Sequence, residues 1–317
     1  MIGVHQALMI AGRKNVTSMV WVPRVASVAN SFTGVARSES IGLFVAISNT
    51  GSSNRVMTSP NGEDWTTGTT ENYPWEDICY SDTLGKFCAI SYATSGSGRY
   101  MVSSDGLSWA DGAMPISGAH GICWADTLGL FVVVGAIGTN RVATSPDGVN
   151  WTAHVGNNSK GWRCVTYSEN LALLIAGATD VSGGQNVMTS QDGSSWDIRS
   201  TPIGEIQSIH HIDDGVVTKI AAVGGQGVTY SADGTLWLDG HESADNVWRG
   251  VTSGAGNFVA VSSSGSSNRS MVSSTGGLWG SQVTPNDQYR AIAYSDSLGV
   301  FVAVATDGDR VMTGTLN

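Results

Sequence analysis

A seven-residue element, Ser-x-Asp-Gly-x-x-Trp, recurs along this chain of 317 residues and constrains its fold more than any other feature. It is complete at 103–109, 145–151, 190–196 and 231–237, and looser copies at 59–65 and 273–279 carry Asn61 and Thr275 in place of the aspartate. Successive tryptophans stand 41 to 45 residues apart. A period of about 43 residues is typical of a unit of four short strands, the blade of a β-propeller.

Each repeat carries the same succession of strand-like runs. A first run such as 75–80 leads into a second such as 131–134, and a third such as 141–144 precedes the Asp-Gly step. That step supplies the positive φ angles of a tight hairpin, whose amides the side chain before the glycine can bind. We therefore assign a structural role to Asn61, Asp105, Asp147, Asp192 and Asp233, and an inter-blade packing role to Trp65, Trp109, Trp151, Trp196, Trp237 and Trp279.

The count of runs predicts a closed ring. First, second and third runs occur seven times each, but only six tryptophan-bearing fourth runs follow them. Trp21 lies 44 residues before Trp65, at the repeat step, so its strand should complete the last blade and remove the free sheet edges. We predict an all-β fold: a seven-bladed β-propeller of four-stranded antiparallel blades over 17–317, closed by the N-terminal strand and preceded by an arm at 1–16.

Composition and charge disfavour several classes of partner. The net charge is -10 and only 13% of residues are charged, so few cations can neutralise phosphates. Nucleic acid is therefore not an expected partner. Membrane insertion is not expected either, because no run approaches the roughly 18 apolar residues of a membrane span. The cysteines Cys79, Cys88, Cys123 and Cys164 lie in apolar runs without metal-site spacing, and we interpret them as buried free thiols folded in a reducing compartment. No signal peptide, cofactor or metal is predicted.

The repeated element resembles the Asp-box, or BNR, repeat of sialidases, some glucan hydrolases, sorting receptors and many bacterial and bacteriophage proteins. The resemblance covers about residues 17–317 and implies a propeller. It also implies that ligands approach the face opposite the Asp-box hairpins, where the loops at 48–54, 94–98, 181–186 and 262–268 are rich in glycine, serine and asparagine. Because the Asp-box is a structural turn in all these families, it implies no particular activity.

One position of the innermost strand changes its polar group from blade to blade. The strand centre is β-branched throughout, at Val35, Ile78, Ile122, Val165, Ile209, Val251 and Ile292. Two residues earlier, and so expected on the same strand face, stand Thr33, Glu76, His120, Arg163, Gln207, Arg249 and Arg290. Guanidinium groups suit bidentate contact with a carboxylate or sulfate, so we predict a site for an acidic sugar at the channel mouth. The alternative is that each arginine pairs with Glu76, Asp77, Glu242, Asp245 or Asp287.

Aromatic residues recur three positions before the strand centre. Trp75, Trp162, Trp248 and Tyr289 either pack between blades or form a rim on which a sugar stacks, and we include them in the predicted site. The arginines that begin the third strands are expected to be scaffold because they repeat at one structural position. They are Arg55, Arg99, Arg141, Arg269 and Arg310.

No catalytic constellation is predicted. A sialidase would need a Tyr/Glu nucleophilic pair and an acid besides the arginines. A two-carboxylate hydrolase would need acids about 5–10 Å apart. Glu76 with Asp287 or Asp245 could form such a pair across the channel, but nothing in the spacing singles them out. His210 and His211 are adjacent on a strand, so their side chains should point to opposite faces and share no ligand.

The sequence therefore predicts a non-enzymatic binding or structural module. The resemblance implies a bacteriophage virion component, of a tail or receptor-binding structure, with other virion proteins as partners and an acidic host glycan as ligand. Such a protein would fold in the host cytoplasm; a bacterial cytoplasmic propeller is the alternative. A purely architectural virion protein and a sialidase-like glycoside hydrolase remain as competing hypotheses.

Overall fold

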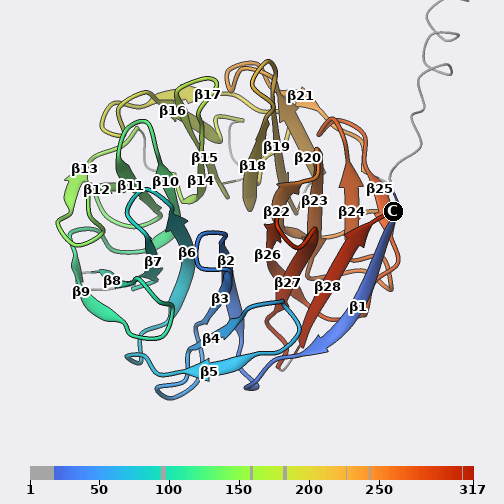
Figure 1. The fold of residues 1–317 in the computed structure, drawn as a ribbon. Coiled ribbons are helices and arrows are strands. Elements are labelled where there is room, and N and C mark those ends of the chain that lie inside the picture. The colour runs from blue at the N-terminus through green and yellow to red at the C-terminus, as the bar shows by residue number, and fades with distance from the viewer. Residues whose placement is uncertain are drawn as a thin grey trace, which may run out of the picture.

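The computed structural model is a ring of β-sheets around a central channel (Figure 1). It describes residues 18–93, 98–157, 160–180, 184–225, 227–242, 244–308 and 310–317. The predicted N-terminal arm at 1–16 lies outside the described residues. No helix long and apolar enough to cross a membrane occurs in the described part of the chain.

Seven antiparallel sheets of four strands each form the blades, as predicted. Each blade runs from an inner strand at the channel to an outer strand at the rim. In ring order the blades are β2 (Phe32–Ser38), β3 (Leu43–Ser48), β4 (Val56–Ser59) and β5 (Thr66–Gly68); β6 (Trp75–Ser81), β7 (Lys86–Ser91), β8 (Gly98–Ser103) and β9 (Ala110–Met114); β10 (Ala119–Ala125), β11 (Leu130–Gly135), β12 (Val142–Ser145) and β13 (Thr152–His154); β14 (Trp162–Ser168), β15 (Leu173–Ala178), β16 (Val187–Ser190) and β17 (Asp197–Arg199); β18 (Ser208–Asp213), β19 (Thr218–Gly224), β20 (Gly227–Ser231) and β21 (Leu238–Asp239); β22 (Trp248–Gly254), β23 (Asn257–Ser262), β24 (Ser270–Ser273) and β25 (Gly280–Gln282); and β26 (Tyr289–Ser295), β27 (Val300–Ala305), β28 (Arg310–Leu316) and β1 (Met19–Val25).

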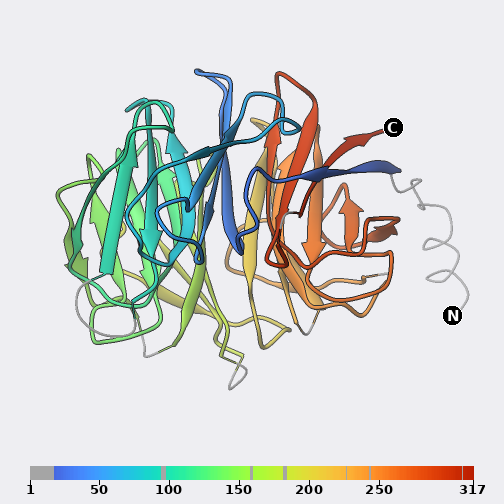
Figure 2. The same ribbon diagram turned by 90° about the horizontal axis from the view of Figure 1, so that it is seen from below.

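The two ends of the described chain close the ring. β1 pairs antiparallel with β28 from Met19↔Leu316 to Val25↔Arg310, so the first strand is the outer strand of the last blade, as predicted (Figure 2). Trp21 is buried in this blade, and a Cβ on Gly314 would lie only 2.6 Å from its ring. Glycine at 314 therefore leaves the space that the closing tryptophan occupies.

The core lies between blades rather than within one layer. The second strands are apolar on both faces because each blade is covered by a neighbour on either side; Phe44, Val45, Ala46 and Ile47 of β3 are all fully buried. One cluster, for instance, joins Val45 and Ile47 of the first blade to Phe87 of the second. In the sequence, such strands are continuous runs of apolar residues rather than alternations of apolar and polar residues.

The Ser-x-Asp-Gly-x-x-Trp element folds into the hairpin between third and fourth strands. In the second blade, Asp105 Oδ1 accepts hydrogen bonds from the amides of Leu107 and Ser108 at 2.8 and 2.7 Å, while Ser103 Oγ accepts one from Gly106. The indole of Trp109 donates to the carbonyl of Gly106. Asn61, Asp147, Asp192 and Asp233 bind their turns in the same way.

The tryptophans of these elements pack against the cores between blades, as predicted. Trp196, Trp237 and Trp279 are buried. Trp65, Trp109 and Trp151 are partly exposed but still lie against inter-blade clusters. The element therefore has a structural role. The polar side chains that vary from blade to blade lie at the channel instead.

Trp21→Ala is expected to lower the free energy of unfolding by about 3–5 kcal/mol, because it removes a buried side chain from the closing strand. Val20, its neighbour on the same strand, is 50% exposed, so Val20→Ala is the matched control. That control should change stability by only about 0.5 kcal/mol. Urea unfolding followed by circular dichroism measures both, and equal losses would contradict the packing of β1 into the ring.

Candidate functional site

A β-bulge near the start of the inner strand recurs in six blades. In β6, Trp75 pairs with Ser91 and Asp77 with Ile90, so Glu76 has no partner in the ladder. A bulge re-aims the side chain of the extra residue. The expectation that this position shares a face with the β-branched centre assumed regular alternation, which the bulge interrupts, but both positions line the channel. The same shift occurs at Thr33, His120, Arg163, Arg249 and Arg290.

The residues at this position all line the central channel, which has a volume of about 440 Å³. Six of them lie in inner strands, and the seventh, Gln207, directly precedes the inner strand β18. We call them the channel ring: Thr33, Glu76, His120, Arg163, Gln207, Arg249 and Arg290. The sequence position singled out for its variable polar groups thus forms a continuous circle inside the channel.

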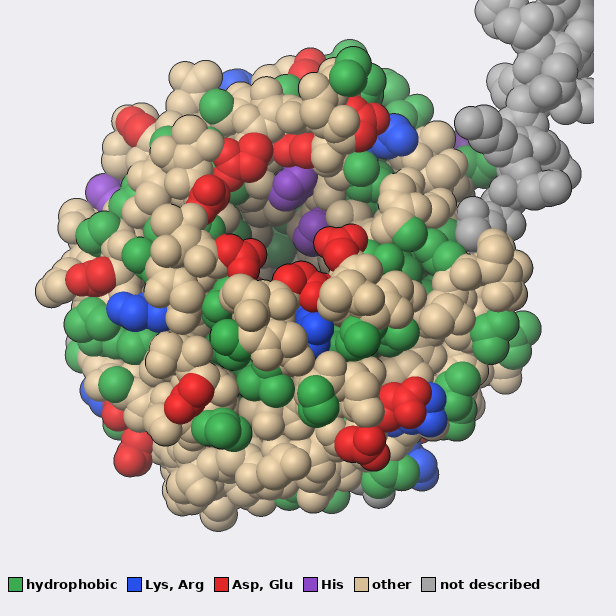
Figure 3. Space-filling model, in the orientation of Figure 1, with side chains coloured by type: hydrophobic (Ala, Val, Ile, Leu, Met, Phe, Trp, Pro, Cys, Tyr) green, Lys and Arg blue, Asp and Glu red, His purple; other side chains and the backbone are tan. Residues whose placement is uncertain are grey.

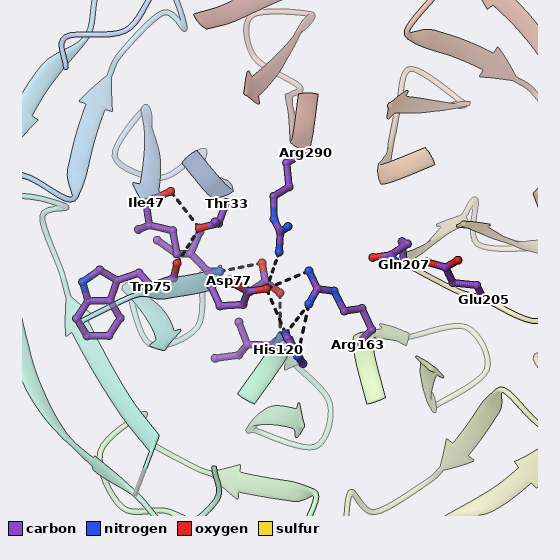
Figure 4. Close-up of polar contacts among 12 residues, drawn as sticks. Thr33, Ile47, Trp75, Asp77, His120, Arg163, Glu205, Gln207 and Arg290 are labelled. Atoms are coloured by element: carbon purple, nitrogen blue, oxygen red, sulfur yellow. Dashed lines mark hydrogen bonds and ion pairs between the residues drawn. The ribbon is translucent and has the colours of Figure 1, made fainter. Parts of the chain in front are cut away.

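One carboxylate holds two of the arginines. Glu76 Oε1 lies 3.0 Å from Arg163 Nη2 and 2.5 Å from Arg290 Nη2 (Figure 4). Only 8% of the Glu76 side chain is exposed, so both ion pairs are well shielded from water. Burial disfavours its ionised form, but the hydrogen bond from His120 and the positive charges of Arg290 and Arg163 lower the pKa of Glu76 to about 2.

His120 completes this corner of the channel. Its Nδ1 lies 3.1 Å from Glu76 Oε1 and 2.6 Å from Arg163 Nη1. Burial lowers the pKa of His120, and although Glu76 opposes this effect, Arg163 adds to it. The imidazole is therefore neutral near pH 7 and adds no charge. Tyr92, which sequence reasoning missed because it begins a loop, stacks on the His120 ring with centroids 4.6 Å apart.

Arg249 has no carboxylate partner among the described residues. Its Nε donates a hydrogen bond of 3.2 Å to the hydroxyl of Ser263. Burial lowers the pKa of Arg249, and so does the positive charge of Arg163, while the negative charge of Glu205 opposes both effects. The channel ring therefore contains three guanidinium groups and one carboxylate, which leaves an excess of two positive charges in a protein of net charge -10.

The remaining members of the channel ring are neutral. Thr33 Oγ1 donates to the carbonyls of Trp75 and Ile47, at 2.8 and 3.3 Å, and so ties two blades together. Gln207 donates to the carboxylate of Glu205. In Figure 4, Gln207 and Glu205 lie apart from Glu76 and make no drawn contact with its cluster. Gln207 precedes β18 of the fifth blade, between Arg163 of the fourth and Arg249 of the sixth.

Asp77 lies beside this cluster and bridges two blades. Its carboxylate accepts hydrogen bonds from the amide of Ile78 at 2.9 Å and from the amide of Ile122 in the next blade at 3.0 Å. Burial raises the pKa of Asp77 to about 7, against the lowering effect of these two hydrogen bonds. Asp77 is thus a channel carboxyl group whose charge changes near neutral pH.

The aromatic residues predicted for the site belong to the core. Trp75, Trp162, Trp248 and Tyr289 are all 0% exposed. The bulge explains this error, because it turns the residue before the extra one back towards the face of the strand centre. These rings cannot stack on a sugar without opening the fold, and Tyr92 is the aromatic side chain beside the cluster.

Two other sequence-based expectations also need correction. The rings of His210 and His211 do not point apart; they are nearly parallel, with centroids 5.3 Å apart, and both residues line the channel. An innermost strand has no neighbour on its channel side, so both side chains can lean there. Cys79, Cys123 and Cys164 are only partly buried and line the channel, whereas Cys88 is buried.

The carboxylates proposed as hydrolase partners are elsewhere. Asp245 and Asp287 are absent from the channel lining, and so is Glu242, which was considered only as an ion-pair partner for the channel arginines. Asp287 instead accepts a hydrogen bond from Tyr289 and lies 3.7 Å from Arg310. The arginines of the third strands are scaffold, as predicted: three of them bind carbonyls of the preceding loop and two pair with acids. They are Arg55, Arg141 and Arg269, and Arg99 and Arg310.

Acidic residues surround the opposite mouth of the channel (Figure 3). Each ends an inner strand or follows it directly, in six of the seven blades: Glu39, Asp82, Asp126, Glu169, Asp213 and Asp296. Several bind the turn of an adjacent blade; Glu39 accepts the amide of Asp296 and Glu169 that of Asp126. Burial opposes the charge of Glu39, but hydrogen bonds from Ser297 and Ser295 lower its pKa to about 2. The channel therefore has one basic and one acidic end.

No group of three or more histidine, cysteine, aspartate or glutamate side chains among the described residues is arranged to hold a metal ion.

The comparisons with known proteins identify a fold and no family. No family model matches the chain, and no curated protein matches it by sequence. Virginiamycin B lyase from Staphylococcus aureus is similar in structure, with a TM-score of 0.79 and 10% identity over 95% of this chain and 100% of the other. YCF48 from Cyanidioschyzon merolae gives 0.65 and 13%, over 93% and 98%. Raptor from Chaetomium thermophilum gives 0.67 and 10%, over 98% of this chain and 30% of its own. At these identities the likeness shows the β-propeller fold alone.

Glu76→Gln is expected to destabilise the protein by about 3–5 kcal/mol, because it leaves the guanidinium groups of Arg163 and Arg290 without their counter-charge. Arg249→Gln should instead raise the free energy of unfolding by about 0.5–2 kcal/mol, since it removes a repelled cation. Glu63, 45% exposed and paired with Arg24, provides a control in Glu63→Gln, whose effect should stay below about 1 kcal/mol. Chemical unfolding tests all three; a destabilising Arg249→Gln would contradict the charge excess.

Proposed function

We propose that the protein is a non-enzymatic binding module that recognises an anionic group of a glycan in its central channel. The observation that carries this proposal is the excess of two positive charges within the channel ring, where Arg249 donates to the hydroxyl of Ser263 and forms no ion pair among the described residues. Charge without a counter-ion in a partly buried site lowers stability. A bound anion is the simplest group that would compensate it.

The surroundings of the arginines suit a sugar that carries an acidic substituent. Guanidinium groups bind planar or tetrahedral oxyanions through parallel hydrogen bonds. Tyr92 stacks on His120, which contacts Arg163, so an aromatic ring lies near this guanidinium group. Aromatic rings pack well against sugar faces. The channel volume of about 440 Å³ accommodates a small saccharide end rather than a long chain lying flat.

The non-enzymatic part of the proposal rests on the state of the carboxylates. Glu76 is ionised and held by two arginines, so it has no proton to donate as a general acid. Asp77 uses both oxygens to bind backbone amides of Ile78 and Ile122. A glycoside hydrolase needs one acid and one base or nucleophile that face the same glycosidic bond. These two residues do not provide such a pair.

The setting that we propose is a bacteriophage virion, in a tail or receptor-binding structure, with other virion proteins as partners. This part is supported by the resemblance of the repeats to Asp-box propellers and by the composition of the chain, and by no structural comparison. A purely architectural virion protein is the competing proposal. It differs in one respect that can be measured, because its channel would bind no glycan.

Glycan-array binding by the purified protein tests the proposal. Wild-type protein should bind a subset of acidic glycans and no neutral ones, and Arg249→Gln should reduce that binding at least tenfold while the fold stays intact. Arg199→Gln is the matched control, because Arg199 lies on the outer strand β17 and pairs with the exposed Asp197. Absence of binding by the wild type would favour the architectural protein instead.

The affinity for an anion should fall as the pH rises from 6 to 8. Asp77, with its pKa raised to about 7 by burial, is protonated at the lower pH and adds a negative charge at the higher one. Among the other channel groups, Glu76 is ionised throughout this range and burial lowers the pKa of His210 to about 4. Burial also lowers the pKa values of His120 and His211 and raises those of Cys79, Cys123 and Cys164.

Calorimetric titration with sulfate, whose own charge is constant over this range, should show a weakening of roughly tenfold. Asp77→Asn should make the affinity independent of pH. An affinity that rises with pH in the wild type would contradict the assignment.

A further inference from the structure

We infer that Cys79 and Cys88 form an oxidation site, at which hydrogen peroxide that enters the central channel converts the two thiols into a disulfide within the second blade. This site does not depend on the proposed function, because oxidation needs no ligand in the channel. Three features carry it: the position of the two cysteines in the sheet, the packing of their side chains, and the unequal access of solvent to them.

The two cysteines stand directly opposite each other in one blade. Cys79 of β6 pairs with Cys88 of β7 in the antiparallel register. Residues opposite each other in such a pair lie on the same face of the sheet, with Cα atoms about 4.5–5.5 Å apart. A disulfide needs Cα atoms about 4.4–6.8 Å apart. The backbone therefore holds this pair within bridging distance.

Side-chain packing places both thiols on the same side of the second blade. Cys88 belongs to the buried cluster between the second and third blades, together with Ile122 and Phe131, and Cys79 packs against that cluster. Burial raises the pKa of Cys79 well above its ordinary value, and the charges of Cys88 and Cys123 raise it further. Cys79 and Cys88 therefore share one apolar environment.

Solvent reaches one of the two thiols before the other. Cys79 is partly exposed and lines the channel, whereas Cys88 is fully buried. Hydrogen peroxide therefore meets Cys79 first: the O–O bond breaks, an S–O bond forms, and the products are a sulfenic acid and water. The Cys88 thiol then attacks the sulfur of Cys79, an S–S bond replaces the S–O bond, and a second water leaves. Two thiols and one hydrogen peroxide thus give one disulfide and two waters.

Burial makes this reaction slow. Thiolate is the reactive form of cysteine, and burial raises the pKa of both Cys79 and Cys88. The site should therefore respond to a lasting change from a reducing to an oxidising environment rather than to a brief exposure. The disulfide would fasten β6, the strand that carries Glu76 and Asp77, to its neighbour β7.

The other channel cysteines have different partners in their ladders. Cys123 pairs with Val132, and Cys164 pairs with Gly177. Cys123 lies on the inner strand of the third blade and affects Cys79 electrostatically, so it is the competing partner. Because no ladder in the described chain holds Cys123 opposite Cys79, we expect Cys88 to react first.

Peptide mapping of the folded, full-length protein after treatment with hydrogen peroxide tests the inference. Trypsin cleaves after Lys86, so Cys79 and Cys88 fall on different peptides, 56–86 and 87–99, and Cys123 falls on 100–141. Remaining thiols are alkylated before the protein is unfolded and digested. Most wild-type molecules should give peptide 56–86 linked to 87–99, with an intact mass lower by two hydrogen atoms. Dithiothreitol should release the link.

Two variants separate the steps. In Cys88→Ala the sulfenic acid of Cys79 should persist and be trapped by dimedone, whereas Cys164→Ala, the matched control, should form the disulfide as the wild type does. Linkage of 56–86 to 100–141 would overturn the inference, and so would a sulfinic acid at Cys79 of the wild type. Thiols that stay reduced under conditions that oxidise the urea-unfolded protein would overturn it as well.

Discussion

The pairing of β1 with β28 is the constraint on which the rest of the structure depends. Every blade is apolar on both faces, so an open row of seven would expose one apolar face at each end, whereas a ring exposes none. Closure is made by backbone pairing over the full length of β1 and by Trp21, which occupies the space that Gly314 leaves. Because the closed ring fixes the seven inner strands relative to one another, one sequence position becomes a circle of side chains at fixed separations.

The bulge then determines what that circle can do. In six blades the register shift leaves this position without a partner in the ladder. The position lines the lumen in all seven blades, and Glu76, Arg163 and Arg290 meet there. If the protein were only a scaffold, a channel ring without net charge would be more stable. Thr33 illustrates a neutral position, because its hydroxyl group bonds two backbone carbonyls. The surplus of positive charge, which works against stability, is therefore best explained by binding.

Much of the fold was predictable because it is encoded locally and repeatedly. The turn chemistry of Asp105 and its counterparts and the position of Trp21 before Trp65 predict blades, their number and the closure. The variable polar position also predicted the channel ring. The bulge was not predictable, because it arises from the register between two strands, and it made the aromatic rim of Trp75, Trp162 and Trp248 an error. The contact between Glu76 and Arg290 spans 214 positions and follows only from closure. The acidic mouth was also predictable from the sequence, because a carboxylate follows the first strand-like run in most repeats.

The central claim is that an anion occupies the space between the channel arginines. Crystals of the protein grown or soaked with selenate, a dianion with a strong anomalous signal, test it directly. The account predicts an anomalous peak inside the channel within hydrogen-bond distance of Arg249 and of at least one of Arg163 and Arg290, and its loss in Arg249→Gln crystals. An empty channel at selenate concentrations that label other surface sites would contradict the account.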